Sequence, residues 1–196
     1  MKITELTGYR GNAIYRTAKS VFKDKEPGER YSPEYSTMNR MRVFTEYLER
    51  YGFVRLGHGT YGTVYEKAGY PWVFKIFKND PAYLYYVTYS KANQANINVP
   101  HIKGHTIAIN ADTYAVRMEK LSSIANEDII EDIEYMAGIL SLSLGERPVD
   151  VEPIIEAYPG IYKIFTDLIQ SGYRLDVHED NIMMRGNVPV ITDPIA

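Results

Sequence analysis

The sequence predicts an α+β fold in two parts, and three observations lead to this prediction. Residues 53–78 are rich in strand-forming side chains and are interrupted by glycines. Beyond Leu121, apolar side chains recur at helical spacing. The closing residues 182–192 again have the pattern of two short strands, around the turn at Gly186. A small sheet, a helical region and a terminal hairpin in this order indicate the α+β class.

Composition excludes several classes of protein. A chain of 196 residues with 45% hydrophobic content is enough for one packed domain or one two-lobed domain. The net charge is −3, whereas proteins that bind double-stranded nucleic acid usually carry a basic surface, so no nucleic-acid partner is expected. Cysteine is absent, which excludes disulfides and thiolate-held metals. We find neither a signal peptide nor an apolar run of about 18 residues, so no membrane association is expected.

The first part of the chain predicts a linker followed by a helix. Residues 23–36 contain two prolines and a glycine and predict a linker or an exposed turn. Residues 38–52 predict a helix that ends at Gly52. Its apolar face, at spacings of three and four residues, consists of Phe44, Tyr47, Leu48 and Tyr51.

The strand-rich region is followed by one helix and two further strands. Asp80 is a candidate N-cap and Pro81 suits the first helical position, which predicts a helix through about Gln94. Strands are expected near residues 104–110 and 113–118.

Two helices are expected after Leu121, the second of them ended by Gly172. Their apolar stripes consist of Ile129, Ile133, Met136, Ala137 and Leu140, and of Ile161, Ile164, Phe165, Leu168 and Ile169.

Three glycines form a G-x-G-x-x-G pattern in the segment LGHGTYGTVYE, at Gly57, Gly59 and Gly62. The pattern alone is weak, because a glycine-rich hairpin would explain it equally well. A dinucleotide-binding fold requires a helix directly after the glycines, whereas strand-forming residues follow here. Strand, glycine loop and strand is the arrangement that covers nucleotide phosphates, since glycine lets backbone N–H groups come close.

Lys75 lies inside the following strand, in V-F-K-I. A strand lysine can simply point to solvent. The glycine loop upstream favours a second interpretation, in which the ammonium group pairs with the α- and β-phosphates of ATP.

The segment RLDVHEDN and the end of the terminal hairpin carry residue types that phosphoryl transfer requires. Asp176 and Asn181 lie in the segment, five positions apart, and Asp193 follows the hairpin. One carboxylate must accept the proton of the attacking hydroxyl group, while an amide oxygen and a second carboxylate hold Mg²⁺. We therefore predict Asp176 as the catalytic base and Asn181 and Asp193 as metal ligands. A solvated acidic loop would explain Glu179 and Asp180, but not this combination of motifs.

Together these motifs resemble those of the protein-kinase-like superfamily. The ending DVHEDNIMMRGNVPVITDP is especially similar to the early-gene serine/threonine kinases of short-tailed, autographivirus-type bacteriophages. The resemblance covers roughly residues 50 to 196. It implies a two-lobed protein-kinase-like fold, with a helical extension over residues 1–50, a β-rich N-lobe over 51–121 and a truncated helical C-lobe over 122–196. It also implies ATP- and Mg²⁺-dependent phosphorylation of bacterial host proteins in the cytoplasm of the infected host.

The resemblance also assigns nucleotide-binding positions. Met118, Glu119 and Leu121 fall where the hinge to the adenine is expected, Val64 follows the glycine loop, and Met183 or Ile182 would form the floor of the pocket. His178 stands where ordinary protein kinases carry a lysine, and its expected role is a hydrogen bond near the γ-phosphate or to the loop backbone. The same D-x-H-x-x-N form occurs in small-molecule phosphotransferases, which keeps that function open.

Three departures from ordinary kinases matter. No glutamate lies between Lys75 and Arg117, so Asp80, Gln94 or the phosphates alone must orient the lysine. Arg174 and Leu175 precede Asp176 in place of His-Arg. Pro194 replaces the usual phenylalanine, and no activation segment is expected after it.

These departures favour a second function, a catalytically weak or inactive nucleotide-binding protein that inhibits a host protein by docking. If the protein is a kinase, residues 1–50 or a homodimer would have to help present its substrate.

Overall fold

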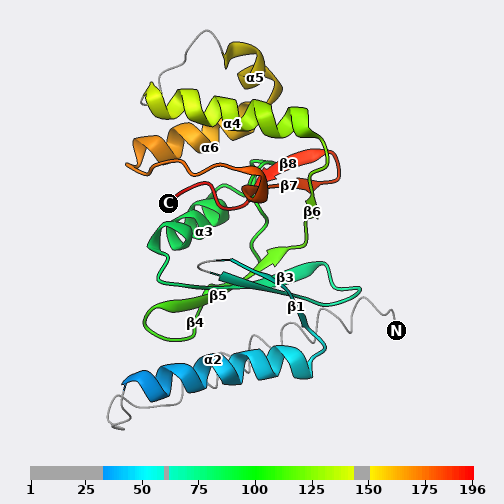
Figure 1. Cartoon of the computed structure of the whole chain (residues 1–196), viewed down its shortest axis with the longest axis vertical. Coiled ribbons are helices and arrows are strands. Elements are labelled where there is room, and N and C mark those ends of the chain that lie inside the picture. The colour runs from blue at the N-terminus through cyan, green and yellow to red at the C-terminus, as the bar shows by residue number, and fades with distance from the viewer. Residues whose placement is uncertain (1–32, 60–61, 144–150) are drawn as a thin grey trace. The chain divides into compact units, whose positions relative to one another are not determined.

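The computed structural model describes residues 33–59, 62–143 and 151–196, and their architecture is α+β, as predicted. The chain divides into two compact units. Figure 1 labels their helices and strands. Of the described residues, unit 1 comprises those up to Asp80 together with Lys103–Lys120, and unit 2 comprises Pro81–Ile102 and those from Leu121 to Ala196. The segment after Asp80, expected within the N-lobe, therefore groups with the helical part of the chain. Within the described residues, no helix has the length and apolar character that crossing a membrane requires.

Unit 1 is built on an antiparallel sheet whose strands follow the order β1-β2-β3-β5-β4. Strands are found in all the regions where the sequence predicts them. Their bounds are Val54–His58 (β1), Gly62–Glu66 (β2), Trp72–Lys78 (β3), Ile107–Ala108 (β4) and Thr113–Glu119 (β5).

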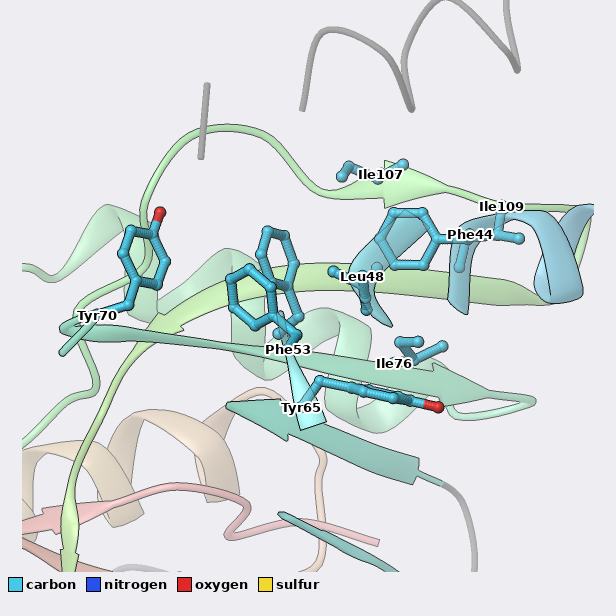
Figure 2. Packing of buried hydrophobic residues seen from close by; sticks show 10 residues of the cluster. Phe44, Leu48, Phe53, Tyr65, Tyr70, Ile76, Ile107 and Ile109 are labelled. Carbon is cyan, nitrogen blue, oxygen red and sulfur yellow. The ribbon is translucent and has the colours of Figure 1, made fainter. Parts of the chain in front are cut away.

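Helix α2 (Pro33–Arg50) contributes its apolar stripe to the core of unit 1. Phe44 and Leu48 are buried in a cluster with Phe53 and Phe74, and Figure 2 shows this packing. The rings of Phe44 and Phe53 both meet Phe74 edge to face, at centroid distances of 6.2 and 5.3 Å. Gly52 has φ +79°, which agrees with its predicted role as the helix stop.

The prediction of a linker over residues 23–36 is wrong for its last four residues, because α2 already begins at Pro33. Proline fits the first turn of a helix, where its missing N–H group costs nothing, so it can mark a helix start as well as a linker. Residues 23–32 lie outside the described residues.

Unit 2 contains the predicted helices and the predicted terminal hairpin, whose turn has Gly186 at φ +61°. Every member of the two predicted stripes is fully buried except Ile129 and Ile169, which are half-buried. The elements are α3 (Pro81–Ala92), β6 (Ser122–Ser123), α4 (Glu127–Leu142), α5 (Glu152–Ala157), α6 (Pro159–Gln170), η2 (Glu179–Asn181), β7 (Ile182–Arg185) and β8 (Val188–Ile191). Strands β6, β7 and β8 form a three-stranded antiparallel sheet.

Tyrosines of α3 attach this helix to the rest of unit 2. The Tyr86 hydroxyl group donates to the Ile191 carbonyl group at 2.7 Å, and the Tyr89 hydroxyl group donates to the Asp167 carboxylate at 2.8 Å. Burial raises the pKa of Tyr86 well above its ordinary value, and the nearby Asp193 carboxylate adds to the shift. The Tyr86 phenol therefore stays protonated and remains a donor to β8.

The loop after α3 packs against the start of α6. Asn96 Nδ2 donates to the Gly160 carbonyl group at 2.8 Å, and the buried Asn98 Nδ2 donates to the Pro189 carbonyl group at 2.7 Å. A Cβ atom at Gly160 would lie only 2.1 Å from Asn98 Oδ1, so no larger side chain fits at this position without displacing the loop.

Candidate active site

The glycine loop is the connection between β1 and β2, and main-chain contacts define it. The Gly59 N–H group donates to the Gly62 carbonyl group at 2.8 Å. The pairing of β1 with β2 shifts register between Arg55 and Gly57, and Gly57 then lies opposite Val64. A Cβ atom at Gly57 or Gly59 would meet no atom of the described residues within 4 Å. The first two glycines therefore leave open space beside the backbone.

Gly62 is different, because the Lys75 side chain passes close to it. A Cβ atom at Gly62 would lie 3.4 Å from Lys75 Cε and 3.1 Å from the Ile76 carbonyl oxygen. Val64 is the direct cross-strand partner of Lys75. The structure thus brings together three of the predicted residues of unit 1, Gly62, Val64 and Lys75.

Strand register assigns Met118 to the same face of the sheet as Lys75. Lys75 pairs with Val116, and Val73 pairs with Met118, whereas Phe74 belongs to the opposite face, in the core with α2. Glu119 alternates with Met118 and therefore directs its side chain to that opposite face. Any contact of Glu119 with a nucleotide on the Lys75 face would have to use its main chain.

The two kinds of glycine predict two different mutant behaviours. Gly59→Ala should leave the melting temperature unchanged and raise the KM for ATP on the order of tenfold, because its methyl group occupies the space for a phosphate. Gly62→Ala should instead cost about 1 kcal/mol of stability, since its methyl group presses on Lys75 and on the β3 backbone. Thermal melts and ATP titrations of both variants test this, and equal effects on both properties would contradict it.

In unit 2, the segment after Asp193 pairs with the segment that contains Asp176. The Asp176 N–H group donates to the Pro194 carbonyl group at 2.8 Å. Leu175 and Ile195 form an antiparallel β-bridge. This pairing places Asp176 opposite Pro194, the residue directly after Asp193, so the main chains at the two predicted carboxylates lie on neighbouring segments. The Asp176 side chain is exposed, as access by a substrate hydroxyl group requires.

Among the described residues, each polar group of Asn181 except the side-chain oxygen has a hydrogen-bond partner. Its N–H group donates to the His178 carbonyl group at 2.8 Å, and its carbonyl group accepts the Thr192 N–H group at 2.8 Å. Its Nδ2 atom lies 2.9 Å from the Asp176 carbonyl oxygen and 2.9 Å from His178 Nε2. Oδ1 is the atom of Asn181 that the predicted role of metal ligand would use. Thr192, which also donates its hydroxyl group to Asn181, is a supporting residue that sequence reasoning missed, although it directly precedes Asp193.

The remaining predicted residues of unit 2 lie on or beside the three strands of its sheet. Ile182 is fully buried, whereas the adjacent Met183 is half-buried on β7, which leaves Met183 as the better candidate for contact with a base. Leu121 is half-buried directly before β6. Asp193 is half-buried at the end of the segment that follows β8.

Gln94, one candidate to replace the missing glutamate, has hydrogen-bond partners within unit 2 for both atoms of its amide. Its Nε2 atom donates to the Ser90 and Pro100 carbonyl groups at 2.6 and 3.0 Å, and its Oε1 atom accepts the Ile102 N–H group at 3.2 Å. These contacts use the whole amide to close the end of α3. Asp80, the other candidate, lies directly before α3.

We compared the chain with solved structures and with curated proteins. Among solved structures, the crystal structure of Rad53 1-466 in complex with AMP-PNP is similar to 78% of this chain, at 16% identity and a TM-score of 0.40. The chain spans 42% of the length of that Rad53 chain. A search of curated proteins finds no match.

A family model, described as bacteriophage T7 protein kinase 0.7, matches residues 3–196, which is nearly the whole chain. The strand-rich unit 1 and the helical unit 2 agree with the protein-kinase-like fold that this match implies. The chain therefore belongs to the bacteriophage T7 protein kinase family.

Proposed function

We propose that this phage kinase transfers the γ-phosphate of ATP, with Mg²⁺, to serine or threonine hydroxyl groups of bacterial host proteins in the host cytoplasm. Family membership supports kinase-type phosphotransfer. The observation that carries the proposal is the loop at Asp176 and Asn181, which is hydrogen-bonded to the segment after Asp193. The loop offers the exposed carboxylate of Asp176 and the amide oxygen of Asn181, and Asp193 lies next to the residue that pairs with Asp176.

The donor atoms fit Mg²⁺. Asn181 Oδ1 and the Asp193 carboxylate are hard oxygen ligands, and Mg²⁺ on a nucleotide takes only one or two protein groups besides phosphates and water. The described part of the chain has no cluster of three or more acidic or histidine side chains that could form a separate metal cage. When bound, Mg²⁺ would neutralise charge on the phosphate oxygens.

Each predicted residue then has one role. Asp176 accepts the proton of the substrate hydroxyl group while that oxygen bonds to the γ-phosphorus. The bond from the γ-phosphorus to the β,γ-bridging oxygen breaks, and ADP leaves. Lys75 pairs with the α- and β-phosphates, and the backbone N–H groups of the glycine loop approach the phosphates in the open space at Gly57 and Gly59.

Exposure of the loop supports a protein substrate. Asp176 and the neighbouring His178, Glu179 and Asp180 are all exposed. A small-molecule kinase instead surrounds most of its substrate with pocket walls. An exposed base is accessible to a hydroxyl group on the surface of another protein.

Label transfer from ATP to proteins of a bacterial lysate tests the proposal. With Mg²⁺, γ-labelled ATP should label discrete proteins at phosphoserine and phosphothreonine, α-labelled ATP should label none, and Asp193→Asn should abolish the signal. Label from the α position would indicate nucleotidyl transfer instead. Absence of label together with intact ATP binding would favour the docking inhibitor.

A further inference from the structure

The imidazole ring of His178 faces Asn181, and this contact defines what the ring can do. His178 Nε2 lies 2.9 Å from Asn181 Nδ2. The 3₁₀ turn η2 begins directly after His178 and ends at Asn181, so these residues, three positions apart, come onto one side of the turn. The ring is therefore directed at a predicted metal ligand.

Hydrogen-bond chemistry fixes the roles of both atoms. Asn181 Nδ2 also contacts the Asp176 carbonyl oxygen, which can only accept, so this atom must be the amide NH₂ group. One of its hydrogens goes to Asp176, and the other goes to His178 Nε2, which must carry the lone pair. The ring proton is then on Nδ1, which lies 3.9 Å from the Asp180 carboxylate.

We infer that His178 is a positioning residue that holds the Asn181 amide with Oδ1 directed at the nucleotide-bound cation. This inference rests on the proposed function and assigns His178 a task other than contact with the γ-phosphate. With both Nδ2 hydrogens engaged, the amide can neither turn over nor rotate away from the metal. Such partners of metal ligands tune both metal affinity and ligand orientation.

Substitutions at His178 distinguish this task from a phosphate contact. Gln places its side-chain oxygen about as far from Cβ as Nε2 and can accept from Asn181. Lys, the residue of ordinary protein kinases at this position, has no acceptor and sets a second donor against Nδ2. A phosphate-contacting role would favour Lys over Gln, and the positioning role favours Gln over Lys. The side chain is 48% exposed, so these variants should all fold.

The test is binding of Mn²⁺ to the full chain with a non-hydrolysable ATP analogue, followed by electron paramagnetic resonance, alongside Mg²⁺ titrations of kinase activity. His178→Ala and His178→Lys should weaken Mn²⁺ binding about tenfold, and His178→Gln should stay within about twofold of wild type. The same order should appear in the half-saturating Mg²⁺ concentration, with metal-free nucleotide affinity unchanged.

Asn181→Ala is the control that separates this inference from the proposed function. If Asn181→Ala weakens Mn²⁺ binding but His178→Ala does not, the positioning role is wrong and the metal site stands. If Asn181→Ala has no effect, the metal site itself is wrong and the inference falls with it. Wild-type metal affinity and turnover in His178→Lys would also overturn the inference.

Discussion

Asp176→Asn should lower kcat by about 10²- to 10⁴-fold, because asparagine cannot accept the proton of the substrate hydroxyl group. The fold should not change, since the hydrogen bonds of Asp176 with Pro194 and Asn181 use its main-chain N–H and C=O groups. Nucleotide affinity should also be retained, because Asp176 is assigned no phosphate contact. Steady-state kinetics, with a host protein that the kinase labels in the lysate experiment as the substrate, measure kcat and the KM for ATP. A thermal melt shows whether the fold is retained.

Glu179→Gln is the matched control for Asp176→Asn. It removes one exposed carboxylate three residues away in the same loop, and should leave kcat within about twofold, as expected for a surface charge without a role in proton transfer. A similar loss in both variants would indicate that the net charge of the loop, and not the base, controls the rate. Full activity of Asp176→Asn would refute its role as the base.

Gly160→Ala should have the largest effect on stability. Its Cβ atom would lie 2.1 Å from Asn98 Oδ1 and 2.6 Å from Asn96 Oδ1, and neither amide can withdraw without losing a hydrogen bond. We expect a loss of about 2–3 kcal/mol from overpacking and the disrupted amides. In a chain of this length, that corresponds to a melting temperature lower by about 5 °C or more.

Gly138→Ala provides a control of opposite sign. Gly138 lies within α4, and a Cβ atom there would meet no atom of residues 33–59, 62–143 or 151–196 within 4 Å. Alanine should stabilise this helix by about 0.5–1 kcal/mol, because glycine has the greater freedom to lose on folding. Calorimetry of both variants measures the difference. A stable Gly160→Ala protein would mean that the Asn96–Asn98 loop rearranges at little cost.

Local signals in the sequence predicted most elements of the fold. Gly52 and Gly172 were expected to end helices, and both have positive φ, at 79° and 83°. The start of α2 was missed, because the signal of Pro33 was ambiguous. Helix α5 was missed because its six residues are too few for an apolar stripe to repeat.

The candidate site was predictable only where its chemistry follows from spacing along the chain. The interval between Asp176 and Asn181 suggested a base and a metal ligand, and the structure joins the two by a hydrogen bond. The pairing of Leu175 with Ile195 depends on how segments distant in the sequence fold together, so no pattern of neighbouring residues predicts it. The contact between Asn98 and Pro189, 91 residues apart, is of the same kind.

The division of the chain into units has a consequence for its synthesis on the ribosome. Strand β3 emerges before α3, but its partner β5 emerges only after α3 and the Asn98 loop, which belong to the other unit. Strands β3 and β5 therefore cannot pair until residues 81–102 have left the ribosome. These residues belong to unit 2, and the rest of unit 2 has not yet been synthesised at that stage. Unit 1 can pair all its strands only after Lys120 has emerged, and at that stage α3 still lacks its partners in unit 2. Early intermediates therefore expose an open strand edge or an uncovered tyrosine-rich helix, and both favour chaperone binding.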